Sequence, residues 1–227
     1  MKCELKYAPQ NLDEVIFPKP AVETQIRSYA ESYLTGSLIF WGPNGTGKSS
    51  LAKILINHIG GSHPSIEPKT YDELVKLDDM REYLLRGSHL ASLTTSQKHF
   101  LLLEEFDLEK KKMATFWTTL DACGDNLMVI ITTNNLLDIH KSIRSRMTTI
   151  EMPLLTPEQV LPRAQEILRA EGISLPNAQV LYYLKNMANP QEIRKYMGIL
   201  DQLIALRKKG LSYPQWQTIR PELKIVN

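Results

Sequence analysis

The sequence predicts an α/β fold, a parallel sheet with helices on both faces, followed by a small all-helical domain. Over the first two thirds of the 227-residue chain, short apolar runs alternate with longer stretches of helical periodicity, as in βαβ units. After Pro153 only helical patterns follow. A glycine-rich segment at 42–49 lies where an apolar run gives way to a helical pattern, which is where sheets of this kind bind ligands.

Strands are expected wherever a short apolar run is bounded by polar or turn residues. Two of these runs, 100–103 and 127–131, are continuously apolar, as in a strand that is covered on both faces. The expected strands lie at 37–41, 99–103 and 127–132, with a short one near 148–152 and a weakly marked one near 64–69. The helices expected between them lie at about 49–59, 71–86 and 109–122.

The last third of the chain carries the signals of three helices. Thr156 suits an N-cap, Pro157 suits the first helical position, and Gln159 suits the partner of Thr156 in a capping box. The first helix should therefore begin after Thr156 and run to about residue 170. Two further helices are expected, from about 177 to before 189 and from about 191 to 208. The predicted domains are 1–153 and 154–209, followed by a C-terminal tail at 210–227.

The segment 42–49 has the spacing of a phosphate-binding loop, called the phosphate loop below. Its glycines allow the backbone to wrap closely around a phosphate, while amide N–H groups and the start of the next helix face the anion. The lysine of the motif would reach the β- and γ-phosphates of a nucleoside triphosphate, and the serine after it would bind Mg²⁺. The residues expected to bind the nucleotide are Gly42, Pro43, Asn44, Gly45, Thr46, Gly47, Lys48, Ser49 and Ser50.

Two carboxylates, Glu104 and Glu105, follow the apolar run 100–103 and therefore stand at the carboxyl end of a predicted buried strand. Ligands of open α/β sheets bind at that edge. Glu104 is expected to hold Mg²⁺ through water, and Glu105 to orient the water that attacks the γ-phosphate. Without the phosphate loop upstream, the same residues would be interpreted as a solvated acidic turn.

The charge, the cysteine content and the apolar segments of the sequence argue against several classes of protein. A net charge of +2 provides no global basic field, so any contact with nucleic acid would depend on a local patch. Cys3 and Cys123 are too few and too far apart for a disulfide framework or a metal site, and they suit a reducing compartment. Neither a run of about 20 apolar residues nor an apolar N-terminal segment is found, so no membrane span and no signal peptide are expected.

These motifs, in this order, resemble those of AAA+ ATPases, and within them the clamp-loader group. The opening 5–15 is similar to the Lys-Tyr-Arg-Pro start of clamp loaders, which a Leu-Asp-Glu-Val-type run follows. Segment 130–135 resembles the end of the sensor-1 strand. Segment 143–147 resembles the Ser-Arg-Cys motif, and segment 189–195 resembles the sensor-2 helix. The similarity covers roughly residues 5–207 and is greatest to the large, ATP-hydrolysing subunits of bacteriophage clamp loaders.

The resemblance implies roles for five further residues. Tyr7 and Pro9 would pack against the adenine base, and Asn134 would lie near the γ-phosphate of ATP. Arg146 would reach in trans into the ATP site of a neighbouring subunit. Arg194 would sense the γ-phosphate and couple it to the position of the helical lid. Each has a plainer interpretation, as an N-terminal turn, a strand-end turn or a solvated surface charge.

The sequence also departs from the family pattern. Glu104 stands in place of the usual Asp and is one methylene longer, which bears on how Mg²⁺ is held through water. Ala8 replaces an Arg, and Met147 replaces a Cys. Clamp-loader subunits also carry a third, helical collar domain, and the sequence stops about where that domain would begin. No collar domain is therefore predicted for this chain.

The function implied by the resemblance is ATP hydrolysis, with Mg²⁺, in a ring or spiral of this chain or of related AAA+ subunits. The assembly would load a sliding clamp onto primer–template DNA during DNA replication, in the cytoplasm of a bacterial or phage-infected cell and without a membrane. Lys110, Lys111 and Lys112 would begin the helix after the acidic motif and contact the DNA backbone. The alternative for these lysines is a solvated charged turn.

Two other functions stay open. Another AAA+ motor of DNA replication, such as a helicase loader or an initiator, would explain the missing collar, whereas the Tyr7-x-Pro9 opening and the Ser145–Arg146 pair favour a clamp loader. A scaffold that binds ATP without hydrolysing it is suggested by Glu104 and opposed by the intact Lys48 and Glu105.

Overall fold

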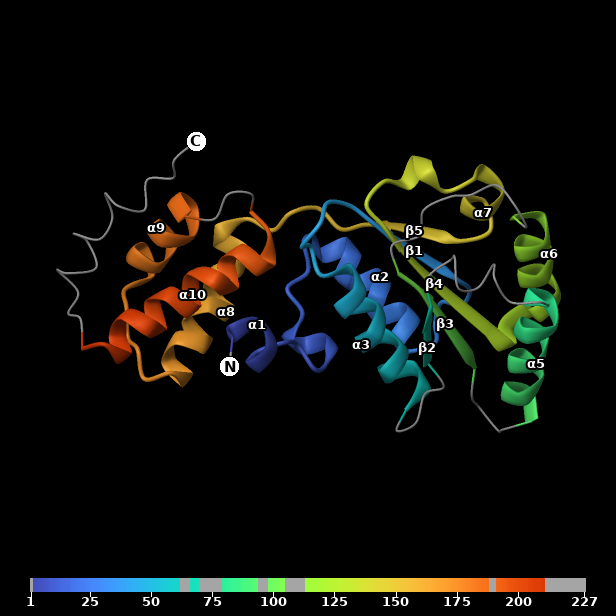
Figure 1. The fold of residues 1–227 in the computed structure, drawn as a ribbon, viewed down its shortest axis with the longest axis horizontal. Coiled ribbons are helices and arrows are strands. Elements are labelled where there is room, and N and C mark those ends of the chain that lie inside the picture. Colours follow the sequence, from blue (N-terminus) through green and yellow to red (C-terminus); the bar gives the residue numbers. More distant parts are fainter. Residues whose placement is uncertain are drawn as a thin grey trace. The chain divides into compact units, whose positions relative to one another are not determined.

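The computed structural model of the chain describes residues 2–61, 66–69, 79–93, 98–104, 113–187 and 191–210. These residues form two compact units (Figure 1). The α/β unit is Pro9–Pro153, and the helical unit combines the residues before Pro9 with those after Pro153.

A five-stranded parallel sheet forms the centre of the α/β unit. Its strands, in spatial order, are β2 (Ile66–Lys69), β3 (His99–Leu103), β4 (Leu127–Thr133), β1 (Leu38–Trp41) and β5 (Thr148–Glu151). All pairings in the sheet are parallel, and Trp41 at the carboxyl end of β1 is aligned with Thr133 and Glu151. The predicted parallel sheet is confirmed, including the weakly marked strand at its edge.

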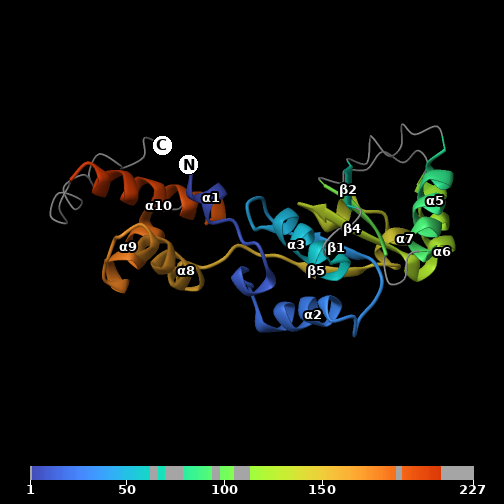
Figure 2. The ribbon, with the colours of Figure 1, turned by 90° about the horizontal axis from the view of Figure 1, so that it is seen from below.

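Helices cover both faces of this sheet (Figures 1 and 2). On one face lie α2 (Pro20–Ala30) and α3 (Lys48–Gly60), and on the other α5 (Met80–Leu93) and α6 (Met113–Cys123). Each face buries an apolar cluster of its own. Successive side chains of a strand point to opposite faces, so Leu38 and Phe40 join the cluster beneath α2 and α3, whereas Ile39 joins the other. This two-sided burial explains why the strands are continuously apolar.

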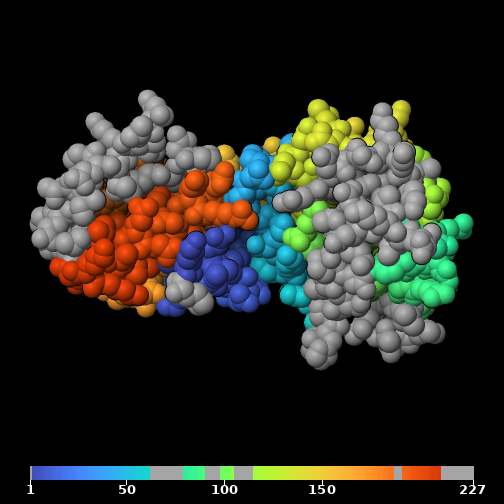
Figure 3. All heavy atoms as spheres, viewed as in Figure 1, coloured from blue at the N-terminus to red at the C-terminus, as the bar shows by residue number. Residues whose placement is uncertain are grey.

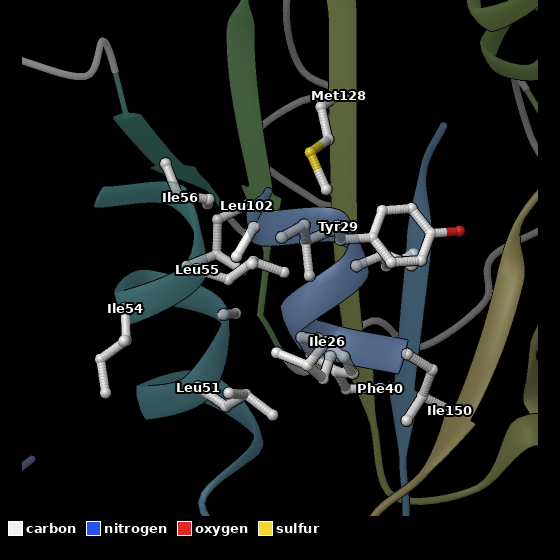
Figure 4. Packing of buried hydrophobic residues seen from close by; sticks show 14 of the residues in the cluster. Ile26, Tyr29, Phe40, Leu51, Ile54, Leu55, Ile56, Leu102, Met128 and Ile150 are labelled. Carbon is white, nitrogen blue, oxygen red and sulfur yellow. The ribbon is translucent and has the colours of Figure 1, made fainter. Parts of the chain in front are cut away.

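The cluster beneath α2 and α3 fixes the position of the phosphate loop. Ile26 and Tyr29 of α2 and Leu51 and Leu55 of α3 belong to the same buried group as Phe40 of β1 (Figure 4). Each of these side chains is at most 4% exposed, and burying a side chain of this kind contributes roughly 1.5–3 kcal/mol. The first turns of α3, which follow the loop directly, are thereby held against the sheet.

The predicted helices do not include α2, although its sequence carries the signals of a helix. Pro20 occupies the first turn, and Val22, Ile26 and Tyr29 recur at spacings of four and three residues. Helix α5 continues beyond the predicted end at residue 86, and the first part of that predicted helix, 71–78, lies outside the described residues.

Three longer helices form most of the helical unit: α8 (Pro157–Ala170), α9 (Asn177–Met187) and α10 (Ile193–Lys208). The capping box predicted at the start of α8 is present. Oγ1 of Thr156 accepts from the backbone N–H of Gln159 at 3.3 Å, and Oε1 of Gln159 accepts from that of Thr156 at 2.8 Å. In the described part of the chain, no helix is both long and apolar enough to cross a membrane.

The segment before Pro9 belongs to the helical unit, which differs from the predicted domain 1–153. Helix α1 (Cys3–Lys6) lies against α10 (Figure 3). The backbone N–H of Cys3 donates to Oδ1 of Asp201 at 2.9 Å, and Nζ of Lys6 lies 2.5 Å from Oε1 of Glu171. These partners stand 198 and 165 residues further along the chain, so no local sequence pattern marks the association.

Candidate nucleotide-binding site

The phosphate loop connects the end of β1 to the start of α3, and its backbone requires glycine. Gly42, Gly45 and Gly47 have φ angles of 144°, 71° and 87°, which side-chain-bearing residues rarely adopt. At Gly42 a Cβ atom would also collide with the backbone carbonyl of Met152, next to β5. The close approach of these two backbones is the reason that only glycine fits the first position of the loop.

Lys48, the first residue of α3, turns its side chain back into the loop. Its Nζ donates to the carbonyl oxygens of Gly42 and Pro43, both at 2.7 Å, and to Oδ1 of Asn134 at 3.2 Å. The residue is 9% exposed, and burial lowers the pKa of its ammonium group. Oγ1 of Thr46 donates to the carbonyl oxygen of Pro43 at 3.1 Å, so the loop is closed by its own hydrogen bonds around the lysine.

Asn134 comes directly after β4, the strand next to β1 in the sheet. The backbone N–H of Gly42 donates to the carbonyl oxygen of Thr133 at 3.3 Å, which continues the pairing of the two strands past their ends. Parallel pairing therefore brings Asn134 to the phosphate loop, and the side chain predicted to lie near the γ-phosphate does lie beside Lys48.

Glu104 directly follows β3 and faces the first turns of α3. One of its carboxylate oxygens lies 3.0 Å from Nζ of Lys53. Lys53 stands four residues after Ser49, and residues at this spacing share one side of a helix. The carboxylate of Glu104 is thus directed to the side of α3 from which Ser49, the predicted Mg²⁺ ligand, projects.

The donor set at this place fits Mg²⁺. The Ser49 hydroxyl and the Glu104 carboxylate are oxygen donors, which Mg²⁺ prefers, and a Mg²⁺ ion on a nucleotide keeps several waters and phosphate ligands. Within the described ranges no group of three or more His, Cys, Asp or Glu side chains could hold a metal ion, so a dedicated protein cage does not occur there. The roles predicted for Glu105, Lys110, Lys111 and Lys112 fall on residues outside the described part and stay predictions.

Arg146 follows the short helix α7 (Lys141–Arg144) and is held at two points. Its Nε donates to Asp121 of α6, at 2.8 Å from Oδ1 and 3.0 Å from Oδ2, and its Nη1 donates to the carbonyl oxygen of Ser142 at 2.9 Å. The hydrogen bond to Asp121 raises the pKa of the guanidinium group. The side chain is 37% exposed, so this fixed cation is open to a neighbouring molecule.

A model of the family described as "ATPase family associated with various cellular activities (AAA)" matches residues 38–154, from β1 to just past β5. The chain belongs to the AAA ATPase family. Membership implies that the chain binds ATP, which agrees with the geometry of the phosphate loop around Lys48.

Relatives of this AAA chain include clamp-loader subunits. It is 29% identical over 211 residues to the sliding-clamp-loader large subunit of Enterobacteria phage T4, covering 87% of this chain and 63% of that protein. It is 28% identical over 212 residues to the sliding-clamp-loader large subunit of Escherichia phage RB69, with coverage of 88% and 63%. The replication factor C large subunit of Thermococcus kodakarensis is 24% identical over 194 residues, with coverage of 81% and 37%. The resemblance to the clamp-loader group is confirmed, and the chain spans less than two thirds of the length of these relatives.

Solved structures agree with the fold of this AAA chain. AMPPCP-bound DnaA from Aquifex aeolicus matches with a TM-score of 0.67 at 15% identity, covering 92% of this chain and 69% of that one. A point variant of RuvB from Thermotoga maritima matches with a TM-score of 0.59 at 15% identity, covering 96% and 80%. These likenesses confirm an AAA+ α/β domain followed by a helical lid.

Two residues predicted to contact ATP lie in the helical unit of this AAA chain. Nε of Arg194, in the first turn of α10, lies 3.1 Å from Oε1 of Glu4, and the Arg194 side chain is 72% exposed. The Tyr7 hydroxyl donates to Oε1 of Glu171 at 2.9 Å. Pro9 begins the α/β unit. The structure therefore divides the predicted site residues between the two units.

Sequence reasoning missed two residues that touch the predicted site residues, Lys53 and Asp121. The spacing of four residues from Ser49 could have indicated Lys53. Asp121 stands 25 residues before Arg146 and carries no local signal, because its role depends on how α6 packs beside α7.

Proposed function

We propose that this chain is an ATP-hydrolysing subunit of a clamp-loader assembly. The observation that carries the proposal is the hydrogen bond from Lys48 of the phosphate loop to Asn134, at the end of the neighbouring strand. It joins the phosphate-binding lysine to a polar side chain at the place expected for the γ-phosphate. The phage relatives, which are named sliding-clamp-loader large subunits, support clamp loading among the functions of the family.

In the proposed reaction, the loop amides and Lys48 bind the β- and γ-phosphates of ATP. Ser49 would hold Mg²⁺ directly and Glu104 through water, and bound Mg²⁺ would supply charge neutralisation for the phosphates. Glu105 orients water for in-line attack on the γ-phosphate. Asn134, which is positioned beside Lys48, donates to the γ-phosphate or to the attacking water.

Arg146 completes the ATP site of a neighbouring subunit in this proposal, so hydrolysis requires an oligomer of this chain or of related AAA+ subunits. An arginine supplied in trans accelerates related NTPases by roughly 10³–10⁵-fold, since it stabilises charge that spreads over the transferring phosphoryl group. Its exposed position supports this role. Arg194 would report the γ-phosphate to the lid, and Tyr7 and Pro9 would contact the adenine.

The proposed output is a spiral that opens a sliding clamp and grips primer–template DNA, then releases both when ATP is hydrolysed. Lys110, Lys111 and Lys112 are the proposed contacts to the DNA backbone. Such contacts depend on charge and shape rather than on base sequence.

The deciding experiment measures ATP turnover with and without primer–template DNA and a cognate sliding clamp. We expect DNA and clamp together to stimulate turnover. Lys48→Ala should abolish ATP binding, whereas Glu105→Gln and Arg146→Ala should retain binding and lose turnover. Arg169→Ala, an exposed arginine of α8, is the matched control and should behave as the parent chain does.

Each alternative function has its own outcome in this experiment. Turnover that responds to DNA but not to any clamp would indicate a helicase loader or an initiator. Tight ATP binding without turnover under every condition would indicate a scaffold. Parental turnover in Arg146→Ala would contradict a site shared between subunits.

A further inference from the structure

Two nitrogens of the Arg146 guanidinium group donate hydrogen bonds to described residues. Of its five N–H donors, the one on Nε is directed to Asp121 and one on Nη1 to the carbonyl oxygen of Ser142. Among the described residues none accepts a hydrogen bond from Nη2. The two contacts therefore fix the plane of the group, and its remaining N–H groups are the donors that an acceptor on another molecule could use.

The element that carries Arg146 is itself attached to α6. The ring of His140, at the N-cap of α7, stacks on the ring of Trp117 of α6, with centroids 5.5 Å apart and an interplanar angle of 19°. Nδ1 of His140 accepts from the backbone N–H of Ser142 at 3.2 Å. Trp117 and Asp121 are one helical turn apart on α6. Helix α6 thus holds both ends of the α7 segment, through the stacked rings at its start and through Asp121 at Arg146.

We propose that Asp121 is the positioning residue for the arginine that this chain supplies to the ATP site of a neighbouring subunit. The inference rests on the proposed function, because it needs Arg146 to act in trans. A long arginine side chain on a surface samples many rotamers, and a group that must meet a transition state gains from being placed before the encounter. Both oxygens of Asp121 lie within hydrogen-bond distance of Nε, which favours one rotamer of the arginine.

The effect of Asp121 belongs to the chain that donates the arginine and not to the chain that binds the nucleotide. Its carboxylate contacts Arg146, whereas the hydrogen bonds described for Lys48 of the phosphate loop go to Gly42, Pro43 and Asn134. Removing Asp121 should therefore lower turnover at the neighbouring site while the affinity of its own chain for ATP stays unchanged. A residue that only stabilised the fold would affect both.

The test uses mixtures of two inactive chains. Lys48→Ala chains keep the arginine but bind no ATP, and Arg146→Ala chains bind ATP but lack the arginine, so turnover in the mixture arises where the two meet. Asp121→Ala is added either to the Lys48→Ala chain or to the Arg146→Ala chain. Alanine suits a helix, and Asp121 is 53% exposed, so both versions should fold.

When Asp121→Ala is on the Lys48→Ala chain, we expect turnover to fall about fivefold, which corresponds to the upper end of the free energy of an exposed ion pair. When Asp121→Ala is on the Arg146→Ala chain, turnover should stay unchanged. Asp121→Glu on the donating chain should restore part of the loss, and Asp125→Ala, a nearby exposed acid, should have no effect. ATP affinity of the single variant Asp121→Ala, measured with a fluorescent ATP analogue, should equal that of the parent.

Two outcomes separate this inference from the proposed function. If the mixture without changes at Asp121 shows no turnover, the shared site is wrong and the inference falls with it. If that mixture is active and Asp121→Ala has the same effect on either chain, or none on the donating chain, the shared site stands and the role of Asp121 is wrong.

Discussion

Nζ of Lys48 lies 3.2 Å from Oδ1 of Asn134, although 86 residues separate them in the sequence. The contact exists because β1 and β4 are parallel neighbours, so their carboxyl ends meet at one edge of the sheet. In the proposed function, it joins the lysine that would bind phosphate to a side chain that would lie near the γ-phosphate.

This relationship predicts the effect of Asn134→Ala. The variant removes one of the three acceptors of a buried ammonium and the polar group beside the expected γ-phosphate. We expect kcat for ATP hydrolysis to fall by roughly 100-fold, as for other positioned polar groups, with a smaller loss of ATP affinity. Single-turnover ATPase assays check this, with Asn126→Ala, at the other end of β4, as control. Unchanged kcat would remove Asn134 from the proposed site.

The close approach at Gly42 predicts a stability effect. Gly42→Ala must displace the carbonyl of Met152 and hold alanine at a φ of 144°, so we expect a loss of about 2–4 kcal/mol in the free energy of unfolding. Gly124→Ala is the matched control: it also has a positive φ but nothing within 4 Å of the added Cβ, so about 1 kcal/mol is expected. Urea unfolding measures both. Equal losses would show that the contact with Met152 has no cost.

The ion pair between Lys53 and Glu104 predicts a change in the Mg²⁺ requirement. In the proposed site, the ammonium of Lys53 and a Mg²⁺ ion would compete for the carboxylate of Glu104, so Lys53→Met should lower the Mg²⁺ concentration at half-saturation. An exposed pair of this kind corresponds to a factor of roughly two to five. The measurement titrates Mg²⁺ at saturating fluorescent ATP analogue.

Lys19→Met serves as its control, since it breaks another surface pair of the α/β unit, to Glu151 at 3.4 Å. A raised Mg²⁺ requirement in Lys53→Met would indicate that Lys53 positions Glu104 instead of competing for it.

The hydrogen bonds of Glu171 predict that its contribution to the free energy of unfolding depends on pH. The side chain is 11% exposed, and hydrogen bonds from Lys6 and then Tyr7 lower its pKa from 4.5 to about 2. A carboxyl with a depressed pKa contributes its stability above the unfolded pKa and loses it as pH falls toward the folded one. The difference in unfolding free energy between the parent and Glu171→Gln should therefore be constant above pH 5 and shrink as pH falls from about 4.5 toward 2.

Circular dichroism during urea unfolding at several pH values measures this difference. Glu166→Gln, on the same helical unit but 58% exposed, should show little change over the same range. A Glu171 difference that is as large at pH 3 as at pH 6 would contradict the depressed pKa.

Much of the α/β unit could be predicted from the sequence, because strands buried on both faces are continuously apolar and the phosphate loop marks a strand-to-helix junction. Asn134 could be singled out by the resemblance of its segment to the sensor-1 strand end, and the parallel pairing of β1 and β4 brings it beside Lys48. The pair between Asp121 and Arg146 could not, because it depends on the packing of α6 beside α7. The position of α1 could not either, because its partners Asp201 and Glu171 stand more than 160 residues away.

The position of α1 has a consequence for how the protein folds as it is made. Residues 3–6 are synthesised before the α/β unit, but the Asp201 carboxylate that accepts from Cys3 is synthesised 198 residues later. At the usual pace of translation this interval is about 10–40 s. During that time the α/β unit can fold, while the first helix waits without its partners. The contact between α1 and α10 can therefore form only after Asp201 has been synthesised, when the α/β unit that lies between them in the sequence is already complete.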